Sequence, residues 1–224
     1  MNQSFSELLR RTAESLKAFQ KSLPTIAKGF QIWMEASEQN AENLARLGWT
    51  LPAWASMRQS VEIYKLGTEE EIEAYFLNMY REDRPEYGLL KNGLLTEDNL
   101  TRWRPLIRQS FRAYERGDYQ IVVPALLTVF EGLVSELSGR FDQKPNIRQA
   151  TLHKLNTASG HTEQWVARSV DLFVSEVFKR HSFKQKRPVR INRHWILHGR
   201  DHADWSKSDA LKLFNAIHTV STLW

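Results

Sequence analysis

The spacing of apolar residues constrains the fold of this chain more than any other feature of its sequence. From Phe5 to Leu23, apolar side chains recur every three or four positions, which places them on one face of an α-helix. Alternation at a period of two, the pattern of a half-buried β-strand, is not convincing anywhere. The sequence therefore predicts an all-α fold. Its expected helices span residues 5–23, 25–47, 69–81, 105–116, 118–137, 147–157, 163–180, 189–198 and 206–222.

Capping and turn-forming residues mark the ends of several of these helices. Pro24 predicts the end of the first helix, because proline has no N–H to donate and crowds the preceding turn. Thr68 and Glu71 have the spacing of a capping box and predict a helix start. Gly199 is placed to terminate the helix before it.

The stretch 82–96 contains one proline and two glycines and is the best candidate for an internal boundary. Helices that follow one another through short connections favour an up-and-down bundle in the second half of the chain. We therefore expect two regions. Residues 1–104 form an N-terminal helical region of unknown role, and residues 105–224 form an antiparallel helical bundle.

The composition excludes several classes of protein. The chain contains no cysteine, which rules out disulfides, thiolate zinc sites and iron–sulfur clusters. No run approaches the roughly 18 uninterrupted apolar residues of a membrane span, and residues 1–20 carry charges where a signal peptide needs an apolar block. We expect a soluble, cytoplasmic protein with no membrane association.

The positive charge is concentrated in one part of the chain. There are 31 Lys and Arg against 26 Asp and Glu, but residues 179–200, here called the basic segment, hold eight of the basic residues and no acidic one. The remaining residues are 23 basic and 26 acidic, a net charge of −3. Such a local field attracts polyanions, and phosphates are the obvious candidates. A solvated basic loop without a ligand is the alternative.

Imidazole and guanidinium groups occur together in the basic segment. On the helix expected at 189–198, Arg190, His194 and His198 are four residues apart and share one face. Arg193 lies close enough for its long side chain to reach round. Imidazole titrates near neutral pH and can move protons, while guanidinium binds phosphate oxygens whose charge grows in the transition state. This pairing suits phosphodiester cleavage.

The stretch from Arg193 to His198 resembles the R-x4-6-H signature of HEPN domains (higher eukaryotes and prokaryotes nucleotide-binding), in which Asn, Asp or His typically follows the Arg. Here that residue is His194. The stretch Tyr114–Tyr119 and the helices around it are also similar, so the resemblance covers about residues 105–222. It implies an antiparallel bundle that forms a homodimer with two motifs facing each other across a cleft. Many such domains are metal-independent endoribonucleases of toxin–antitoxin, abortive-infection and other antiviral defence systems.

The resemblance implies that Arg193 and His198 are catalytic, with His194 as the accompanying polar residue. RNA carries its own nucleophile, the 2′-hydroxyl, so the protein needs a base for its proton, an acid for the departing 5′-oxygen and a cation for the phosphorane. Two copies of His198 and Arg193 in a dimer supply these groups without a metal or other cofactor. DNA lacks the 2′-hydroxyl and should resist cleavage. The expected partners are RNA, a second copy of the chain, and an antitoxin or sensor protein.

Further residues are candidates for binding RNA or for supporting the site. The basic side chains that are predicted to bind RNA are Arg190, Arg200, Lys184, Lys186 and Arg187, with a solvated loop as the alternative. Asn192 and Glu131 are candidates for support. Glu131 is placed to orient an Arg across the bundle, but an ordinary solvated glutamate is the favoured interpretation.

Three alternatives remain open at the level of sequence. A non-catalytic adaptor of the same fold would use the basic surface to bind RNA or an acidic partner. His194, His198 and His202 have a spacing with which helical histidines chelate zinc, although Gly199 should end the helix before His202. The eight tryptophans invite base stacking, but burial is the favoured interpretation for them, Trp195 included.

Overall fold

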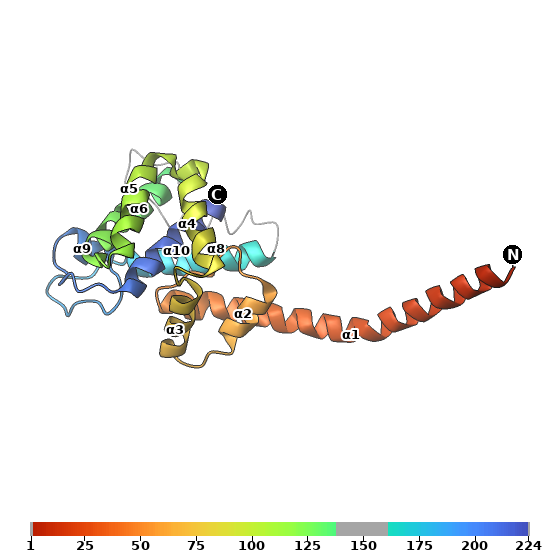
Figure 1. Cartoon of the computed structure of the whole chain (residues 1–224). Coiled ribbons are helices and arrows are strands. Elements are labelled where there is room, and N and C mark those ends of the chain that lie inside the picture. Colours follow the sequence, from red (N-terminus) through yellow and green to blue (C-terminus); the bar gives the residue numbers. More distant parts are fainter. Residues whose placement is uncertain (1, 138–160, 224) are drawn as a thin grey trace.

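The computed structural model describes residues 2–137 and 161–223, and helices dominate both ranges (Figure 1). Neither range contains a β-strand, which confirms the predicted all-α class. The helix expected at 147–157 lies outside the described residues. The elements are α1 (Asn2–Arg46), α2 (Met57–Tyr64), α3 (Glu69–Met79), α4 (Pro85–Thr96), the 3-10 helix η1 (Asp98–Trp103), α5 (Arg104–Glu115), α6 (Tyr119–Leu137), α8 (His161–Val177), α9 (Arg193–Leu197) and α10 (Lys207–Leu223).

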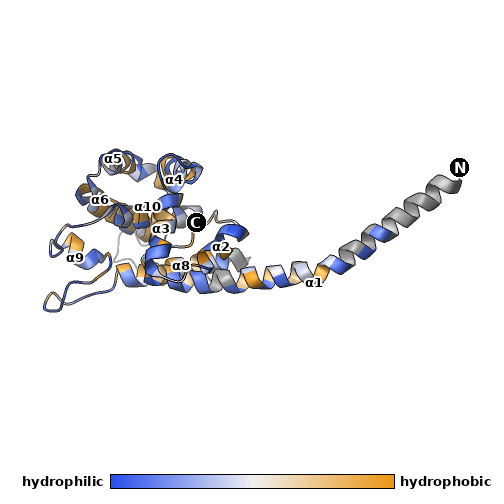
Figure 2. Cartoon of the chain, turned by 60° about the horizontal axis from the view of Figure 1, so that its bottom comes forward, coloured by the Kyte–Doolittle hydropathy of each residue, from blue (hydrophilic) through white to orange (hydrophobic). Residues whose placement is uncertain are grey.

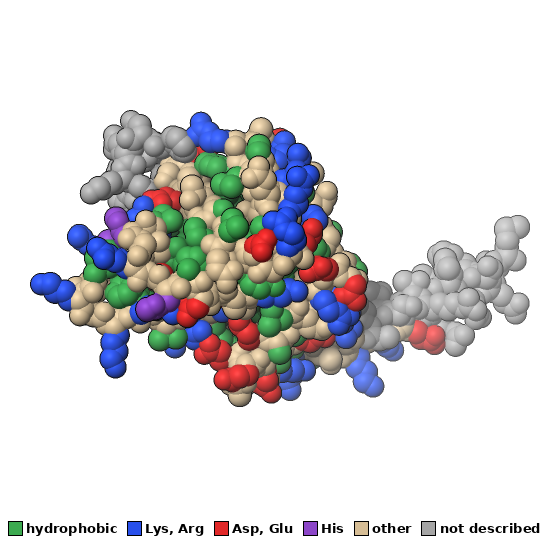
Figure 3. All heavy atoms as spheres, turned by 60° about the vertical axis from the view of Figure 1, so that its left-hand side comes forward, with side chains coloured by type: hydrophobic (Ala, Val, Ile, Leu, Met, Phe, Trp, Pro, Cys, Tyr) green, Lys and Arg blue, Asp and Glu red, His purple; other side chains and the backbone are tan. Residues whose placement is uncertain are grey.

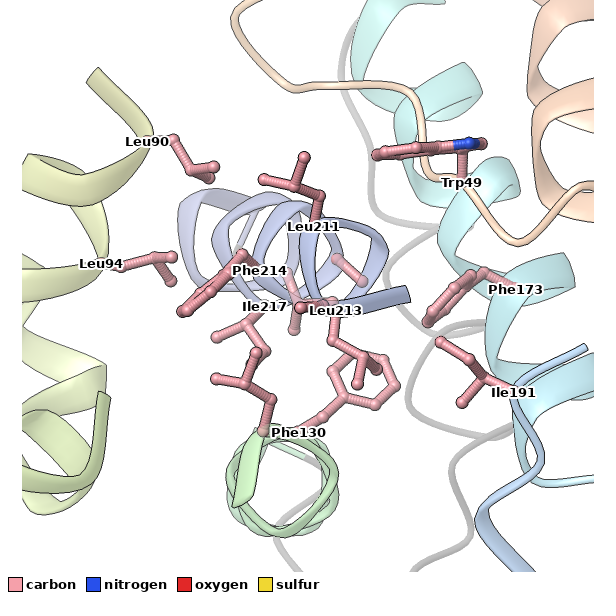
Figure 4. Packing of buried hydrophobic residues seen from close by; sticks show 14 of the residues in the cluster. Trp49, Leu90, Leu94, Phe130, Phe173, Ile191, Leu211, Leu213, Phe214 and Ile217 are labelled. Carbon is pink, nitrogen blue, oxygen red and sulfur yellow. The ribbon is translucent and has the colours of Figure 1, made fainter. Parts of the chain in front are cut away.

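Helix α10 lies at the centre of the packing (Figures 1 and 4). Every side chain from Ala210 to Ser221 is buried. Phe111 of α5 stacks on Phe214 of α10 with ring centroids 4.2 Å apart. Apolar side chains of α4, α6 and α8 also point toward α10, among them Leu90, Leu94, Phe130 and Phe173 (Figure 4).

Helix α6 is long and apolar enough, by length and composition, to cross a membrane. In the structure, nine of its 19 residues are buried, and the helix packs against α5 and α10. Its hydrophobic residues, like those of α4 and α5, gather on the side toward α10 (Figure 2). The apolar composition of α6 is therefore that of a core helix.

Helix α1 runs unbroken from Asn2 to Arg46 and extends well beyond the other helices (Figure 1). The prediction of two helices separated at Pro24 is wrong. Pro24 removes one backbone hydrogen bond, but Leu23, Pro24 and Thr25 are exposed, so water can bond the carbonyl that is left without a donor. Only the C-terminal part of α1 packs against α2 and α8 (Figure 1).

The hydrophobic core is continuous across the predicted boundary between residues 104 and 105. Element η1 ends at Trp103 and α5 begins at Arg104, without a linker between them. One cluster of buried apolar residues includes Trp49, Phe76 and Leu94 as well as residues of α6, α8 and α10. The assignment of separate roles to 1–104 and 105–224 stays a prediction.

Helix α3 begins where the sequence predicts. The Thr68 hydroxyl accepts the Glu71 N–H at 3.2 Å, and the Glu71 carboxylate accepts the Thr68 N–H at 3.1 Å, which completes the capping box. The helix ends at Met79, two residues before the expected end. From its first two turns, Glu69 and Glu73 reach residues of the basic segment and of α10.

Candidate active site

Helix α9 is short because the residues on both sides of it leave the helical conformation. Asn192 is extended (φ −130°, ψ 114°), and its Oδ1 accepts the Trp195 N–H at 3.1 Å. Its Nδ2 donates to the Lys179 carbonyl at 2.8 Å, which ties α9 to the loop that follows α8. Gly199 has φ +64°, a left-handed conformation. The helix predicted over 189–198 is therefore wrong in extent, and His198 is the C-cap.

His194 and His198 lie one turn apart with their imidazoles in contact. The ring centroids are 4.7 Å apart and the planes meet at 74°. His198 is exposed and His194 is half-buried, so the pair opens to solvent. The predicted proximity of these two histidines is confirmed. The expected shared helix face is wrong for Arg190, which precedes the N-cap of α9.

Phe183, in the loop before α9, packs against this pair. Its ring is parallel to His194 (6°) at a centroid distance of 4.6 Å, and it lies 5.8 Å from the ring of His198. The Arg200 guanidinium lies over the same ring at 5.4 Å. Phe183 is not among the residues predicted for the site from the sequence. The signal for it was its place in the sequence: an aromatic residue inside the basic segment, next to Lys184.

The pKa of His194 lies below its ordinary value. Burial is the largest cause, because it disfavours the charged imidazolium. Four neighbouring groups that carry or can acquire positive charge act in the same direction, in the order His198, Arg180, Arg193 and His181. These surroundings favour the neutral imidazole of His194, the form that can accept a proton.

Arg193 forms a two-pronged ion pair with Glu131 of α6. Its Nε and Nη2 donate to the two carboxylate oxygens at 3.0 and 2.5 Å. The side chains are 30 % and 25 % exposed, so the pair is partly shielded from water. The favoured prediction of a solvated Glu131 is wrong, and the alternative, an Arg oriented across the bundle, is what the structure shows. This bond fixes the guanidinium in position beside α9.

Two of the arginines predicted to bind RNA are held by carboxylates of the same chain. Arg190 makes a two-pronged bond to Glu69 of α3, with its Nη2 2.7 Å from the carboxylate. Arg187 donates to Asp204 at 3.0 and 2.6 Å, and its Nε lies 2.7 Å from Asp201. The prediction that these two arginines are free to bind RNA is therefore wrong. Their ion pairs connect the loops around α9 to other parts of the chain. All three acidic partners lie outside the basic segment.

The other predicted RNA-binding residues, Lys184, Lys186 and Arg200, are exposed. The two lysines lie in the loop between α8 and α9. Figure 3 shows Lys and Arg side chains (blue) projecting around histidines (purple) on this end of the molecule. These three side chains stay candidates for contact with phosphates.

The structure also bears on the zinc and tryptophan interpretations. Within residues 2–137 and 161–223, no group of three or more His, Asp or Glu is placed to hold a metal ion. His202 lies beyond Gly199 and outside α9, as the sequence predicts. Trp195 is 7 % exposed and meets the Phe183 ring edge-on at 5.8 Å, which confirms its predicted burial.

The histidine pair lies on an open surface. A cavity of about 60 Å³ lies between the end of α1, α8 and the start of α10, and it reaches Arg190. A second one, of about 250 Å³, lies between α1 and α8. Arg193, His194 and His198 line neither of them. A substrate or a second protein surface is needed to enclose the pair.

Comparisons with known proteins identify no relative: no family model, no curated protein and no solved structure matches the chain. The functional interpretation therefore depends on the geometry of α9 and its surroundings.

Proposed function

We propose that this protein is a metal-independent endoribonuclease whose C-terminal region, residues 105–224, is HEPN-like. The observation that supports this most is that the same short segment carries two imidazoles in contact and an arginine whose guanidinium is anchored by Glu131. Exposed basic side chains surround the pair and attract a polyanion.

The proposed reaction needs proton transfer and charge stabilisation. A neutral imidazole removes the proton of the 2′-hydroxyl, and the 2′-oxygen attacks the adjacent phosphorus to form a phosphorane. Arg193 stabilises the negative charge of the phosphorane. An imidazolium then protonates the 5′-oxygen as the P–O5′ bond breaks, which leaves a 2′,3′-cyclic phosphate and a 5′-hydroxyl. His198, the more exposed of the pair, faces the substrate, with His194 as its neutral neighbour. In a homodimer, the partner's His198 supplies the second proton transfer.

The resemblance to HEPN domains also carries the proposed biology. It favours a cytoplasmic toxin or defence effector that works as a homodimer through the bundle and is controlled by an antitoxin or a sensor protein. The bundle face that carries α9 is the surface that a second copy would cover.

A non-catalytic adaptor is the second candidate, and one observation favours it. Arg187, Arg190 and Arg193 are all paired with carboxylates. This pairing reduces the positive charge that is free to act on a scissile phosphate. An adaptor with this fold would use Lys184, Lys186 and Arg200 to bind RNA without cutting it.

The deciding experiment is RNA cleavage in EDTA with purified full-length protein. Wild type should produce 2′,3′-cyclic phosphate ends, and His198→Ala and Arg193→Ala should each lower the rate at least 100-fold, in line with the loss of a general base or a charge stabiliser. His202→Ala, an exposed histidine of the next loop, is the matched control and should cut normally. Equal cleavage by all four proteins would reject the site. Binding without cleavage by wild type would favour the adaptor.

A further inference from the structure

Residues 2–32 of α1 form an arm that leaves the body of the protein on the side away from α9 (Figures 1 and 2). The last turns of α1 are anchored: Trp33 meets Trp165 of α8 edge-on at 5.2 Å, and Asn40 donates to the Ser60 carbonyl at 2.6 Å. Leu44 is fully buried. Along the arm, Leu23 and Phe30 are 44 % and 46 % exposed. At these two positions the helix face is uncovered.

The sequence of the arm follows a heptad repeat. Counting from Phe5, the spacing alternates strictly between four and three residues as far as Trp33, and the positions are Phe5, Leu9, Thr12, Leu16, Phe19, Leu23, Ile26, Phe30 and Trp33. Eight of these nine residues are apolar. The same count continues to Asn40 and Leu44, which pack into the body. One seam therefore runs the length of α1, and its C-terminal end already serves for packing between helices.

The charges of the arm lie away from this seam. With Leu9, Leu16, Leu23 and Phe30 at heptad position a, every charged residue between 2 and 32 falls at b, c or f. These residues are Glu7, Arg10, Arg11, Glu14, Lys17, Lys21 and Lys28. Positions e and g hold only uncharged residues, mostly Ser, Ala and Gly. Small flanking residues allow a partner helix to approach closely.

A helix of this composition needs a partner. Helices in proteins owe most of their stability to packing of their apolar face. The arm contains Pro24 and Gly29, which disfavour a helix interior by about 3 and 1 kcal/mol relative to alanine. Pro24 stands at position b, so its ring points away from the seam. Contacts along the seam are the source of stabilisation that can offset these residues.

We propose that the arm pairs with the same arm of a second copy of this chain, as a coiled coil along the seam from Phe5 to Phe30. Phenylalanine buries about 150–250 Å². The three phenylalanines of two arms therefore contribute about 900–1,500 Å², and the leucines bring the total to the roughly 1,600 Å² of a stable interface. The arm and α9 lie at opposite ends of the molecule (Figures 1 and 2), so this interface is separate from the bundle dimer proposed above.

The heptad period favours a helical partner over a membrane surface. Apolar residues at a period of 3.5 drift by about 20° per heptad around a straight helix, or about 80° over four heptads. A supercoiled partner follows that drift, whereas a flat bilayer needs the apolar residues in a straight line. The arm has five basic and two acidic residues, so binding to an anionic membrane is an outcome that the experiment must separate.

Disulfide trapping tests the pairing directly, because the natural chain has no cysteine. Phe19 lies near the midpoint of the seam, where two copies come close in either a parallel or an antiparallel pair. Phe19→Cys should give a disulfide-linked dimer under mild oxidation, and Leu16→Cys provides a second seam position. Lys17→Cys, at position b, is the matched control and should stay monomeric on a non-reducing gel. Equal cross-linking at seam and control positions would overturn the proposal.

Particle mass by light scattering provides the second readout. The double variant Leu23→Glu with Phe30→Glu should halve the particle mass of the full-length protein, while Thr25→Glu with Gln31→Glu, on the outer face, should leave it unchanged. The same mass for all three proteins would contradict the proposal. The membrane alternative predicts a wild-type protein that stays monomeric and sediments with phosphatidylserine vesicles, and a double variant that no longer sediments. That result would also contradict the proposal. Neither readout depends on RNA cleavage.

Discussion

The carboxylate partners of the arginines decide what each arginine of the basic segment can do. Arg190 is bonded to Glu69, and Arg193 to Glu131. Both bonds join residues more than 60 positions apart. The sequence predicts one cationic surface for the basic segment. In the structure, some of its arginines are paired with carboxylates, while other side chains, such as Lys184, are exposed.

A charge exchange separates the structural from the catalytic role of Arg193. Glu131→Arg and Arg193→Glu should each destabilise the fold by about 2–3 kcal/mol, because each places like charges together in a partly shielded position. The double variant should recover most of the loss, since the opposite charges face each other again. RNA cleavage should remain absent in the double variant. Urea denaturation gives the stabilities, and recovery of cleavage together with stability would show that Arg193 acts only through the fold.

His218 predicts a loss of stability in acid. Its ring is buried in α10, its Nδ1 has no hydrogen-bond partner in the described structure, and burial lowers its pKa from 6.5 to about 4. Between pH 6.5 and pH 4 the unfolded chain binds a proton that the folded chain does not, so stability falls as the pH falls. At pH 5 the loss from this group is about 2 kcal/mol relative to pH 7.

The comparison that isolates His218 is His218→Leu, which cannot bind a proton. Urea denaturation gives the free energy of unfolding at pH 7 and at pH 5. The difference between the two should be about 2 kcal/mol smaller in the variant than in wild type. His202→Leu, an exposed histidine, should keep the wild-type difference. Identical pH dependence in wild type and His218→Leu would show that His218 is protonated in the folded protein.

Among the elements, α9 depends most on a single side chain. Asn192 caps the helix and also donates to the Lys179 carbonyl. A cap contributes about 1 kcal/mol and a buried hydrogen bond about another 1 kcal/mol, so Asn192→Ala should destabilise the protein by about 2 kcal/mol. Ser56→Ala, which removes the cap of α2, should lose about half as much. Equal losses in urea denaturation would mean that the bond to the Lys179 carbonyl contributes nothing.

Two helix-interior glycines predict opposite effects of the same substitution. A Cβ on Gly132 of α6 would lie 2.5 Å from Cζ2 of Trp103, so Gly132→Ala must displace the indole and should destabilise by about 1–2 kcal/mol. A Cβ on Gly88 of α4 would meet nothing within 4 Å. Gly88→Ala should therefore gain up to about 1 kcal/mol from helix propensity. Thermal unfolding measures both, and a stabilised Gly132→Ala would show that α6 and η1 are less closely packed.

Elements set by local interactions were predictable from the sequence, and elements set by distant contacts were not. The helix class and the start of α3 were predictable because apolar periodicity and the Thr68 capping box are local. The length of α9 was not, because Asn192 is drawn out of the helix by a carbonyl 13 residues away. The contact of His194 with His198 follows from their spacing. The sequence made Glu131 only a candidate for orienting an Arg, because its pairing with Arg193 depends on how α6 and α9 pack.

For the whole molecule, α10 connects the two predicted regions. The Asn215 side chain is fully buried, donates to the Thr50 carbonyl and hydroxyl at 2.8 Å, and accepts the Tyr80 hydroxyl at 2.6 Å. All of these partners lie before residue 105. An independent C-terminal bundle would leave this amide without its partners and would expose the face of α10 that α4 covers.

The fragment 105–224 should therefore not fold alone. Among the large core side chains that it lacks are Trp49, Phe76, Tyr80, Leu90 and Leu94. Burial of such side chains contributes about 1.5–3 kcal/mol each, so their loss, about 10 kcal/mol, matches the entire stability of a typical domain. Full-length protein should unfold in urea in one transition by circular dichroism and by tryptophan fluorescence. A shared core cannot be divided without unfolding both parts. A fragment with helical circular dichroism and its own cooperative transition would therefore show that the boundary at 104/105 separates two folding units.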